Sequence, residues 1–166
     1  MIKEHLVLLL SVSLLATSLS PGLSDQDTAP EADAAVGTWL TVEGKAIVEI
    51  FKCEETYCGR IVWLRDPLKE GKPVVDDKNP DEKLRARPVL GMMLLWEFVY
   101  DEDNVWTGGT IYDPESGDEY SARMTLVGDA ELELRGYVLI PLFGRTETWT
   151  WIEGLPDSEI QVEPGE

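Results

Sequence analysis

The stretch EYSARMTLVGDAELELRGYVLI, residues 119–140, decides the fold of this chain. Its first half alternates between two faces, one with Tyr120, Ala122, Met124 and Leu126 and the other with Ser121, Arg123, Thr125 and Val127. Gly128 and Asp129 then turn the chain into a second alternating run over residues 131–140, in which Leu132, Leu134 and Gly136 share a face. A period of two with a tight turn between the runs predicts two antiparallel strands.

The same pattern recurs through most of the chain. We expect further strands at residues 37–42, 46–52, 57–64, 92–100, 105–113 and 145–152, with a hairpin turn at residues 114–117. Residues 65–88 form a long connection that is interrupted by prolines and holds at most a helical turn near 81–85. The sequence therefore predicts an all-β protein, an eight-stranded antiparallel up-and-down barrel whose long connection joins strands 3 and 4. Closure of the barrel removes exposed strand edges, and a two-sheet sandwich is the main alternative.

The ends of the chain carry different signals. Residues 1–22 resemble a secretory signal peptide, because the apolar run Leu6–Ala16 is too short to span a bilayer and small residues follow it, with cleavage after Ser18 or Gly22. We therefore expect an exported protein, periplasmic or extracellular, with no transmembrane segment after signal removal. Residues 23–35 are predicted to be a flexible acidic linker, 36–153 the barrel domain and 154–166 an acidic, disordered tail.

Composition narrows the possible functions. The formal net charge of −18 disfavours nucleic acid and anionic membrane surfaces as partners. The one histidine, His5, lies in the predicted signal peptide, so the mature chain would lack the commonest general base and metal ligand. No acidic run has calcium-loop spacing, and we expect no metal and no cofactor. Cys53 and Cys58 are predicted to form a structural disulfide, because their spacing does not fit a redox motif and a zinc site would need further ligands.

Several longer motifs resemble one bacterial family. They are Gly37-Thr38-Trp39, CGRIVWL (58–64), DKNPDEKLRARP (77–88), Gly91, WTGGTIYDP (106–114), Gly117, Tyr120, RGY (135–137) and GRTETWT (144–150). In this order and spacing they are similar to the bacterial exported domain of unknown function 2147, over about residues 36–153. The resemblance implies a lipocalin-like (calycin-like) barrel that binds a small, apolar ligand, with no reaction established for the family.

The resemblance also bears on the floor of the barrel. Gly37-Thr38-Trp39 looks like the Gly-x-Trp opening of lipocalin-type barrels, in which the Trp plugs the closed end. The family pattern tends to place Arg after Thr-Trp-Thr, where this chain has Trp151. We therefore expect Trp39 to meet either Trp151, in an aromatic contact, or Arg145.

Aromatic and basic residues are the candidates for ligand contacts. The chain has six Trp and five Tyr, and a cavity lined by rings is one interpretation, with ordinary core packing as the other. The candidates for apolar contact are Trp63, Met92, Trp96, Trp106 and Tyr112. Arg60, Arg85 and Arg87 are candidates for holding an acid group of the ligand. Alternatively Arg60 reaches solvent, and Arg85 and Arg87 pair with Asp76, Asp77 or Asp81 and pin the connection to the rim.

Three functional hypotheses follow. The leading one is a non-enzymatic cell-envelope protein that binds or carries a small apolar or amphipathic ligand. The second is a structural module with a self-filled core that engages an envelope protein. The third is an enzyme, which the sequence favours least because its remaining candidate acids, such as Asp113, flank a solvated turn and because it has no Gly-x-Ser-x-Gly motif.

Overall fold

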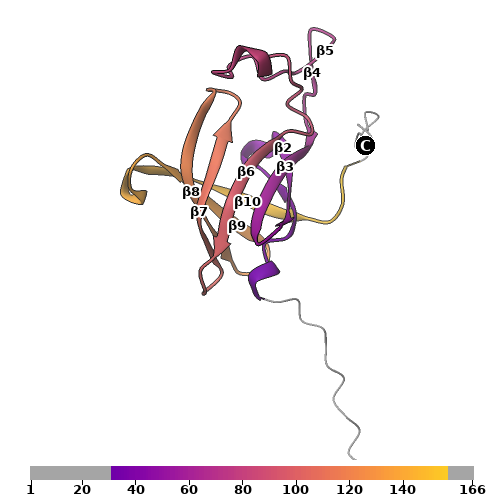
Figure 1. The fold of residues 1–166 in the computed structure, drawn as a ribbon. Helices are drawn as coiled ribbons and strands as arrows, with labels where there is room; N and C mark the ends of the chain where they lie inside the picture. Colours follow the sequence, from indigo (N-terminus) through magenta and orange to yellow (C-terminus); the bar gives the residue numbers. More distant parts are fainter. Residues whose placement is uncertain (1–30, 157–166) are drawn as a thin grey trace, which may run out of the picture.

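The computed structural model describes residues 31–156, so the predicted signal peptide, most of the predicted linker and the end of the tail lie outside the described residues. Within that part of the chain, eight antiparallel strands close into a barrel in the order β1-β10-β9-β8-β7-β6-β3-β2 (Figure 1). They are β1 (Gly37–Leu40), β2 (Ala46–Cys53), β3 (Thr56–Leu64), β6 (Met93–Tyr100), β7 (Val105–Asp113), β8 (Asp118–Val127), β9 (Glu131–Tyr137) and β10 (Gly144–Ile152). The predicted barrel is confirmed, and the sandwich alternative is wrong.

Two connections differ from expectation. The long connection contains a small hairpin, β4 (Leu68–Lys69) and β5 (Lys72–Pro73), besides the expected single turn at η3 (Glu82–Leu84). The strand predicted over 131–140 ends at Tyr137, and the chain then forms a loop with a short 3-10 turn, η4 (Pro141–Phe143). The alternation over residues 131–136 and the apolar residues after it suggested a continuing strand, but pairing between β9 and β10 ends at Gly144 and Tyr137.

The alternation in residues 119–137 decides what enters the barrel. Ala122, Met124, Leu132 and Leu134 are buried, whereas their neighbours in sequence reach the surface or lie part-way. β8 and β9 pair so that Met124 lies opposite Leu134 and Leu126 opposite Leu132. Because side chains on a strand alternate between its two faces, this register places both apolar rows in the lumen.

Gly109 on β7 lets the barrel wall come close to the ring of Phe98 on the neighbouring strand β6. A Cβ atom at this position would lie 2.4 Å from the ring of Phe98. The β7–β8 register shifts between Trp106 and Gly109. The register shift is typical of a β-bulge, and the missing side chain of Gly109 leaves room for the Phe98 ring.

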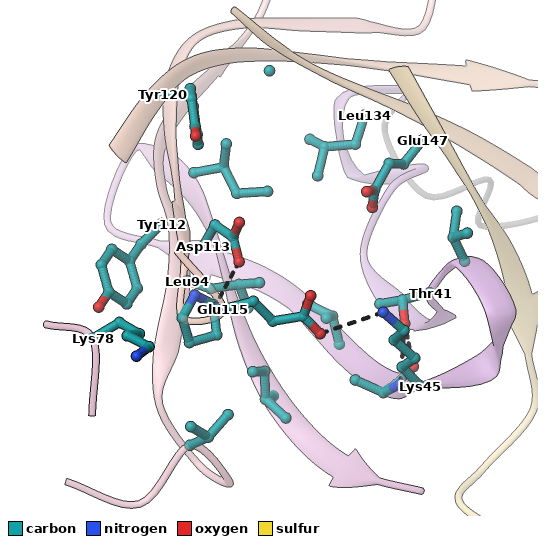
Figure 2. Close-up of a pocket in the computed structure, with 18 of the residues that line it drawn as sticks. Thr41, Lys45, Lys78, Leu94, Tyr112, Asp113, Glu115, Tyr120, Leu134 and Glu147 are labelled. Atoms are coloured by element: carbon teal, nitrogen blue, oxygen red, sulfur yellow. Dashed lines mark hydrogen bonds and ion pairs between the residues drawn. The ribbon is translucent and has the colours of Figure 1, made fainter. Parts of the chain in front are cut away.

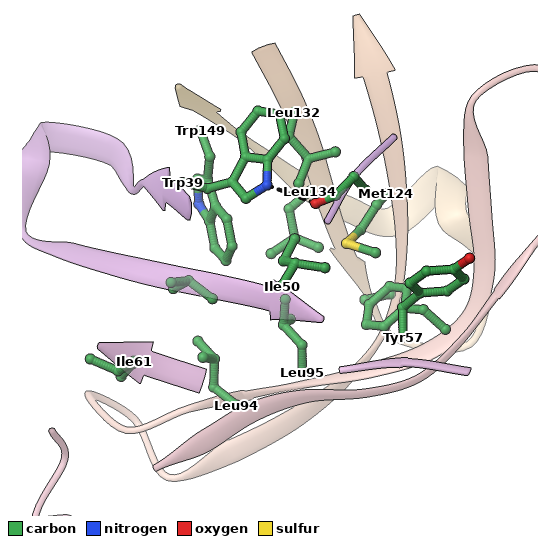
Figure 3. Packing of buried hydrophobic residues seen from close by; sticks show 14 of the residues in the cluster. Trp39, Ile50, Tyr57, Ile61, Leu94, Leu95, Met124, Leu132, Leu134 and Trp149 are labelled. Carbon is green, nitrogen blue, oxygen red and sulfur yellow. Dashed lines mark hydrogen bonds between the residues drawn. The ribbon is translucent and has the colours of Figure 1, made fainter. Parts of the chain in front are cut away.

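Large rings fill one half of the lumen. Trp39, Phe98, Trp106 and Trp149 are at most 2% exposed and belong to one apolar cluster with Ile50, Leu95, Met124 and Leu132 (Figure 3). The Trp39 indole N–H donates to the carbonyl of Ala35 at 2.9 Å, so this buried donor is paired. This half of the barrel is therefore a packed core, which we call the closed end.

The segment just before β1 closes that end. A 3-10 turn, η1 (Glu31–Asp33), lies beneath the barrel (Figure 1). The Trp106 indole donates to the carbonyl of Ala32 at 3.1 Å, and the Tyr57 hydroxyl donates to the Asp33 carboxylate at 2.5 Å. Residues 31–35, which were predicted to end the linker, thus pack against the closed end of the barrel. Their anchoring depends on barrel residues far away in sequence, which composition does not reveal.

The Cys53–Cys58 disulfide is present at the same end. It clips the β2–β3 turn, where Cys53 and Thr56 pair. This confirms the predicted structural disulfide. Within residues 31–156 no helix has the length and apolar character needed to cross a membrane.

Candidate functional site

A cavity of about 1080 Å³ occupies the other half of the barrel, which we call the open end. Its walls come from the ends of strands that point away from η1, together with the long connection and the β9–β10 loop. It arises because the bulky rings lie at the closed end, while the strand positions above them carry smaller side chains. The inner wall comprises Ala46, Val48, Ile61, Leu94, Ile111, Leu134 and Gly136.

The rim of the cavity is charged. The rim includes Lys45, Lys69, Lys78 and Arg145, together with Glu43, Asp66, Asp77, Asp113 and Glu115. Glu147 lies deeper, opposite Leu134 of the inner wall, and its carboxylate accepts a hydrogen bond from the Trp149 indole at 3.4 Å. An apolar interior under a polar rim suits an amphipathic molecule, because the tail can leave water while the head stays hydrated.

One ion pair spans the opening. Lys45 precedes β2, whereas Glu115 lies in the β7–β8 turn, and β3 and β6 separate these strands in the barrel wall. Their side chains meet at 3.3 Å (Figure 2). The hydrogen bond and charge of Glu115, with the charge of Glu43, raise the pKa of Lys45. Both partners are well exposed, so the pair contributes little to stability and can open readily.

A buried carboxylate fixes the long connection to the barrel. Asp76 is fully buried and accepts hydrogen bonds from the Tyr112 hydroxyl at 2.6 Å, the Asn79 amide at 2.7 Å and the Arg87 guanidinium at 2.7 Å. Tyr112 stands on β7, so the contact ties residues 76–87 to the wall beside the cavity. Burial disfavours the ionised carboxylate, but these hydrogen bonds and the Arg87 charge outweigh it and lower the pKa of Asp76 below its ordinary 3.8.

Replacing Asp76 with alanine should lower the free energy of unfolding by about 3 kcal/mol, because it leaves a buried hydroxyl, an amide and a guanidinium without their shared acceptor. Urea unfolding followed by circular dichroism measures this loss. The pKa of Asp76 is lower in the folded state, so its contribution is complete above the unfolded value and disappears as the pH falls through the folded value. The wild type should therefore lose stability below pH 3.8 more steeply than Asp76→Ala does. Equal acid slopes for the two proteins would contradict this role.

Two tyrosines should ionise late. Burial, followed by the hydrogen bond to Asp33, raises the pKa of Tyr57 to about 12, and burial with the hydrogen bond to Asp76 does the same for Tyr112. Both folded values exceed the ordinary 10.0, so their stabilisation is complete below pH 10 and is lost as the pH rises toward 12. In a spectrophotometric titration, Tyr57→Phe and Tyr112→Phe should each remove one late-ionising group. If a variant keeps the whole high-pH phase of the titration, the residue replaced in it is not one of the late-ionising tyrosines.

The three predicted arginines lie outside the cavity lining. Arg60 is on the outer face of β3, where it pairs with Glu49 at 2.7 Å and lies 5.3 Å from the Phe51 ring centre. Arg85 donates to the carbonyl of Asn79 at 2.8 Å, and Arg87 pairs with Asp76. The structure thus favours the alternative in which Arg60 reaches solvent and Arg87 pins the connection through Asp76.

The predicted aromatic set is also divided. Of the five apolar candidates, all within the described residues, Tyr112 lines the cavity. Met92 is buried in the core cluster, Trp96 packs against it and Trp106 is fully buried at the closed end. Trp63 is half-buried on β3, and the cavity lining does not include it. Ring size led to most of these candidates, but bulky rings also fill space, as Trp106 does in the packed half of the lumen.

Sequence reasoning missed the small and aliphatic positions that leave room. Inward positions near the open ends of the strands, such as Val48 and Ile61, carry no aromatic or charged signature. The signal that could have found them is the alternation itself, counted outward from the closed end of each strand.

The floor follows one of its two expected arrangements. Trp39 meets Trp151 edge-on, with ring centres 5.3 Å apart. Arg145 stands six residues before Trp151 on β10, at the cavity rim, with its side chain 85% exposed. The structure therefore does not place Arg145 at the floor, because the two residues occupy opposite ends of one strand.

Comparisons with known proteins agree with this architecture. The family model described as an uncharacterized protein conserved in bacteria, DUF2147, matches residues 37–151. A solved structure of the Helicobacter pylori protein HP1028, described as belonging to the lipocalin family, superposes with a TM-score of 0.64 at 24% sequence identity. The match covers 71% of this chain and 82% of that one. No curated protein sequence matches the chain.

Proposed function

This chain belongs to the DUF2147 family of bacterial proteins, and we propose that it is an exported, non-enzymatic protein that binds a small apolar or amphipathic ligand in its open-end cavity. The observation that carries the proposal is the cavity of about 1080 Å³ with an aliphatic inner wall. Its size is close to the upper limit of about 1,000 Å³ for small-molecule sites. The ligand tail would contact Val48, Ile61, Leu94 and Leu134, and its head would remain among the charged side chains of the rim.

Export is supported by the predicted signal peptide and by the disulfide, since such bonds persist in oxidising compartments. A binding rather than catalytic role is supported by the position of the one histidine, His5, within that predicted signal. The Asp76 network ties up Arg87 and Tyr112 in structural contacts, which leaves the rim lysines to meet any polar head.

Uptake of N-phenyl-1-naphthylamine, a neutral apolar dye, tests the proposal. Dye fluorescence should rise on titration with the protein, and native mass spectrometry of freshly purified protein should reveal a co-purified lipid. Arg60→Ala, which changes the outer face, should leave dye affinity unchanged. A protein that takes up no dye and carries no lipid would favour the alternative of a module that engages an envelope protein.

A further inference from the structure

The β9–β10 loop, residues 138–143, exposes an unusual run of apolar side chains. Its sequence is VLIPLF, with no charged or hydrogen-bonding side chain. Leu139 is 90% exposed, Leu142 76% and Phe143 72%, and Val138 and Ile140 are about half exposed. Isolated exposed leucines are ordinary, but a contiguous apolar cluster on a soluble domain indicates a surface that is covered in use.

The shape of the loop indicates what kind of surface could cover its apolar side chains. The loop reaches out from the barrel as a separate protrusion (Figure 1). Leu139 at its tip has a left-handed backbone conformation, with φ of 68°, which a leucine rarely adopts. Nothing in the packing of the barrel requires that side chain, because it is almost fully exposed. The unfavourable backbone conformation therefore has one visible effect, which is to hold an apolar side chain out in the surroundings.

Much of the loop backbone is paired internally. Ile140 N–H donates to the Val138 carbonyl, and Phe143 N–H donates to the Ile140 carbonyl. Arg135 donates to the Pro141 carbonyl at 2.7 Å and to the Leu142 carbonyl at 3.5 Å, and proline has no N–H of its own. Paired backbone groups are what a hydrocarbon environment demands, since an unpaired N–H or carbonyl there is costly.

The loop is continuous with the cavity. Val138 and Phe143 lie on the cavity lining, and so does Arg145, which follows directly. A surface that receives the loop tip would therefore lie next to the cavity entrance. Arg135 and Arg145 flank the apolar run on either side in sequence, and the Arg145 side chain is 85% exposed.

We propose that residues 138–143 insert into the surface of a zwitterionic lipid bilayer and so set the cavity entrance against the membrane. The proposal goes beyond ligand binding and does not depend on the cavity being filled. The net charge of −18 selects against anionic bilayers, so the attraction is apolar. A few inserted side chains give weak, reversible attachment, comparable to that of one acyl chain.

Sedimentation with sucrose-loaded phosphatidylcholine vesicles tests this docking. The wild type should bind, and Leu139→Asp and Leu142→Asp should each lower the partition coefficient at least about 10-fold, because each removes one inserted side chain and adds a charge. Val99→Asp is the matched control, since Val99 is a 51% exposed valine on β6, outside the loop. It should bind vesicles as the wild type does.

Two further measurements make the result specific. High salt should not release the protein, and added phosphatidylglycerol should weaken binding. The emission of a polarity-sensitive dye on Leu142→Cys should shift to the blue when vesicles are added, and labelling is selective because the described cysteines form a disulfide.

No vesicle binding by the wild type, equal binding by the loop variants, or salt-sensitive binding limited to anionic vesicles would each overturn the proposal. Dimerisation that depends on the loop, without vesicle binding, would also overturn the proposal and would indicate that the loop mediates self-association. Loss of dye uptake with retained vesicle binding would refute the ligand proposal alone.

Discussion

Replacing Trp39 with alanine is expected to lower the free energy of unfolding by about 3–5 kcal/mol. The indole is fully buried, meets Trp151 edge-on and donates to the Ala35 carbonyl. Alanine would leave a cavity at the closed end and an unpaired carbonyl in the segment that caps it. Urea unfolding, followed by far-ultraviolet circular dichroism so that the lost chromophore does not bias the signal, measures the change.

Trp39→Phe is the matched variant. It keeps an aromatic ring against Trp151 but loses the indole N–H, so its destabilisation should be smaller, about 1–2 kcal/mol. A loss below about 1 kcal/mol for the alanine variant would mean that the floor is not held by this residue. Dye uptake at the open end should survive in both variants while they remain folded, because Trp39 is not part of the cavity lining.

Replacing Gly136 with leucine is expected to weaken binding of the apolar dye by at least about 10-fold with little change in stability. Gly136 is on β9, faces the lumen and lines the cavity. A Cβ atom there would find Ile111 and Tyr120 at 3.6 Å, which is ordinary contact. The larger side chain would therefore extend into the space that we assign to the ligand, and a strand residue with a side chain also loses less entropy on folding than glycine.

Ser121→Leu adds the same bulk on the outside. Ser121 lies on the neighbouring strand β8, with its side chain exposed. It should leave dye affinity unchanged, which separates occupancy of the lumen from a general effect of an added leucine. Full dye binding by folded Gly136→Leu protein would place the ligand elsewhere and would remove the main support for the carrier proposal.

The Asp76 network shows where sequence reasoning stops. The turn chemistry at 79–81 is local: Asn79 and Asp81 accept backbone N–H groups at 2.9 and 3.0 Å, as these residue types commonly do at turns and helix starts. The partnership of Asp76 with Tyr112 joins residues 36 positions apart. Nothing in either local sequence distinguishes this aspartate from its exposed neighbour Asp77, because its burial results from how the connection folds back on the barrel.

By itself the sequence determined the strands, because alternation and turn residues act over a few neighbours. It favoured closure into a barrel over a two-sheet sandwich, and the strand pairing in the structure decided between them. It also determined the Cys53–Cys58 bridge. Only the tertiary structure decided which inward positions pack and which leave space. Period-two patterning specifies a face of a strand but not a depth along the barrel axis, and the cavity is defined by depth. The tertiary structure likewise decided that Leu139 and Leu142 remain outside, whereas the sequence was expected to continue the strand through residues 138–140.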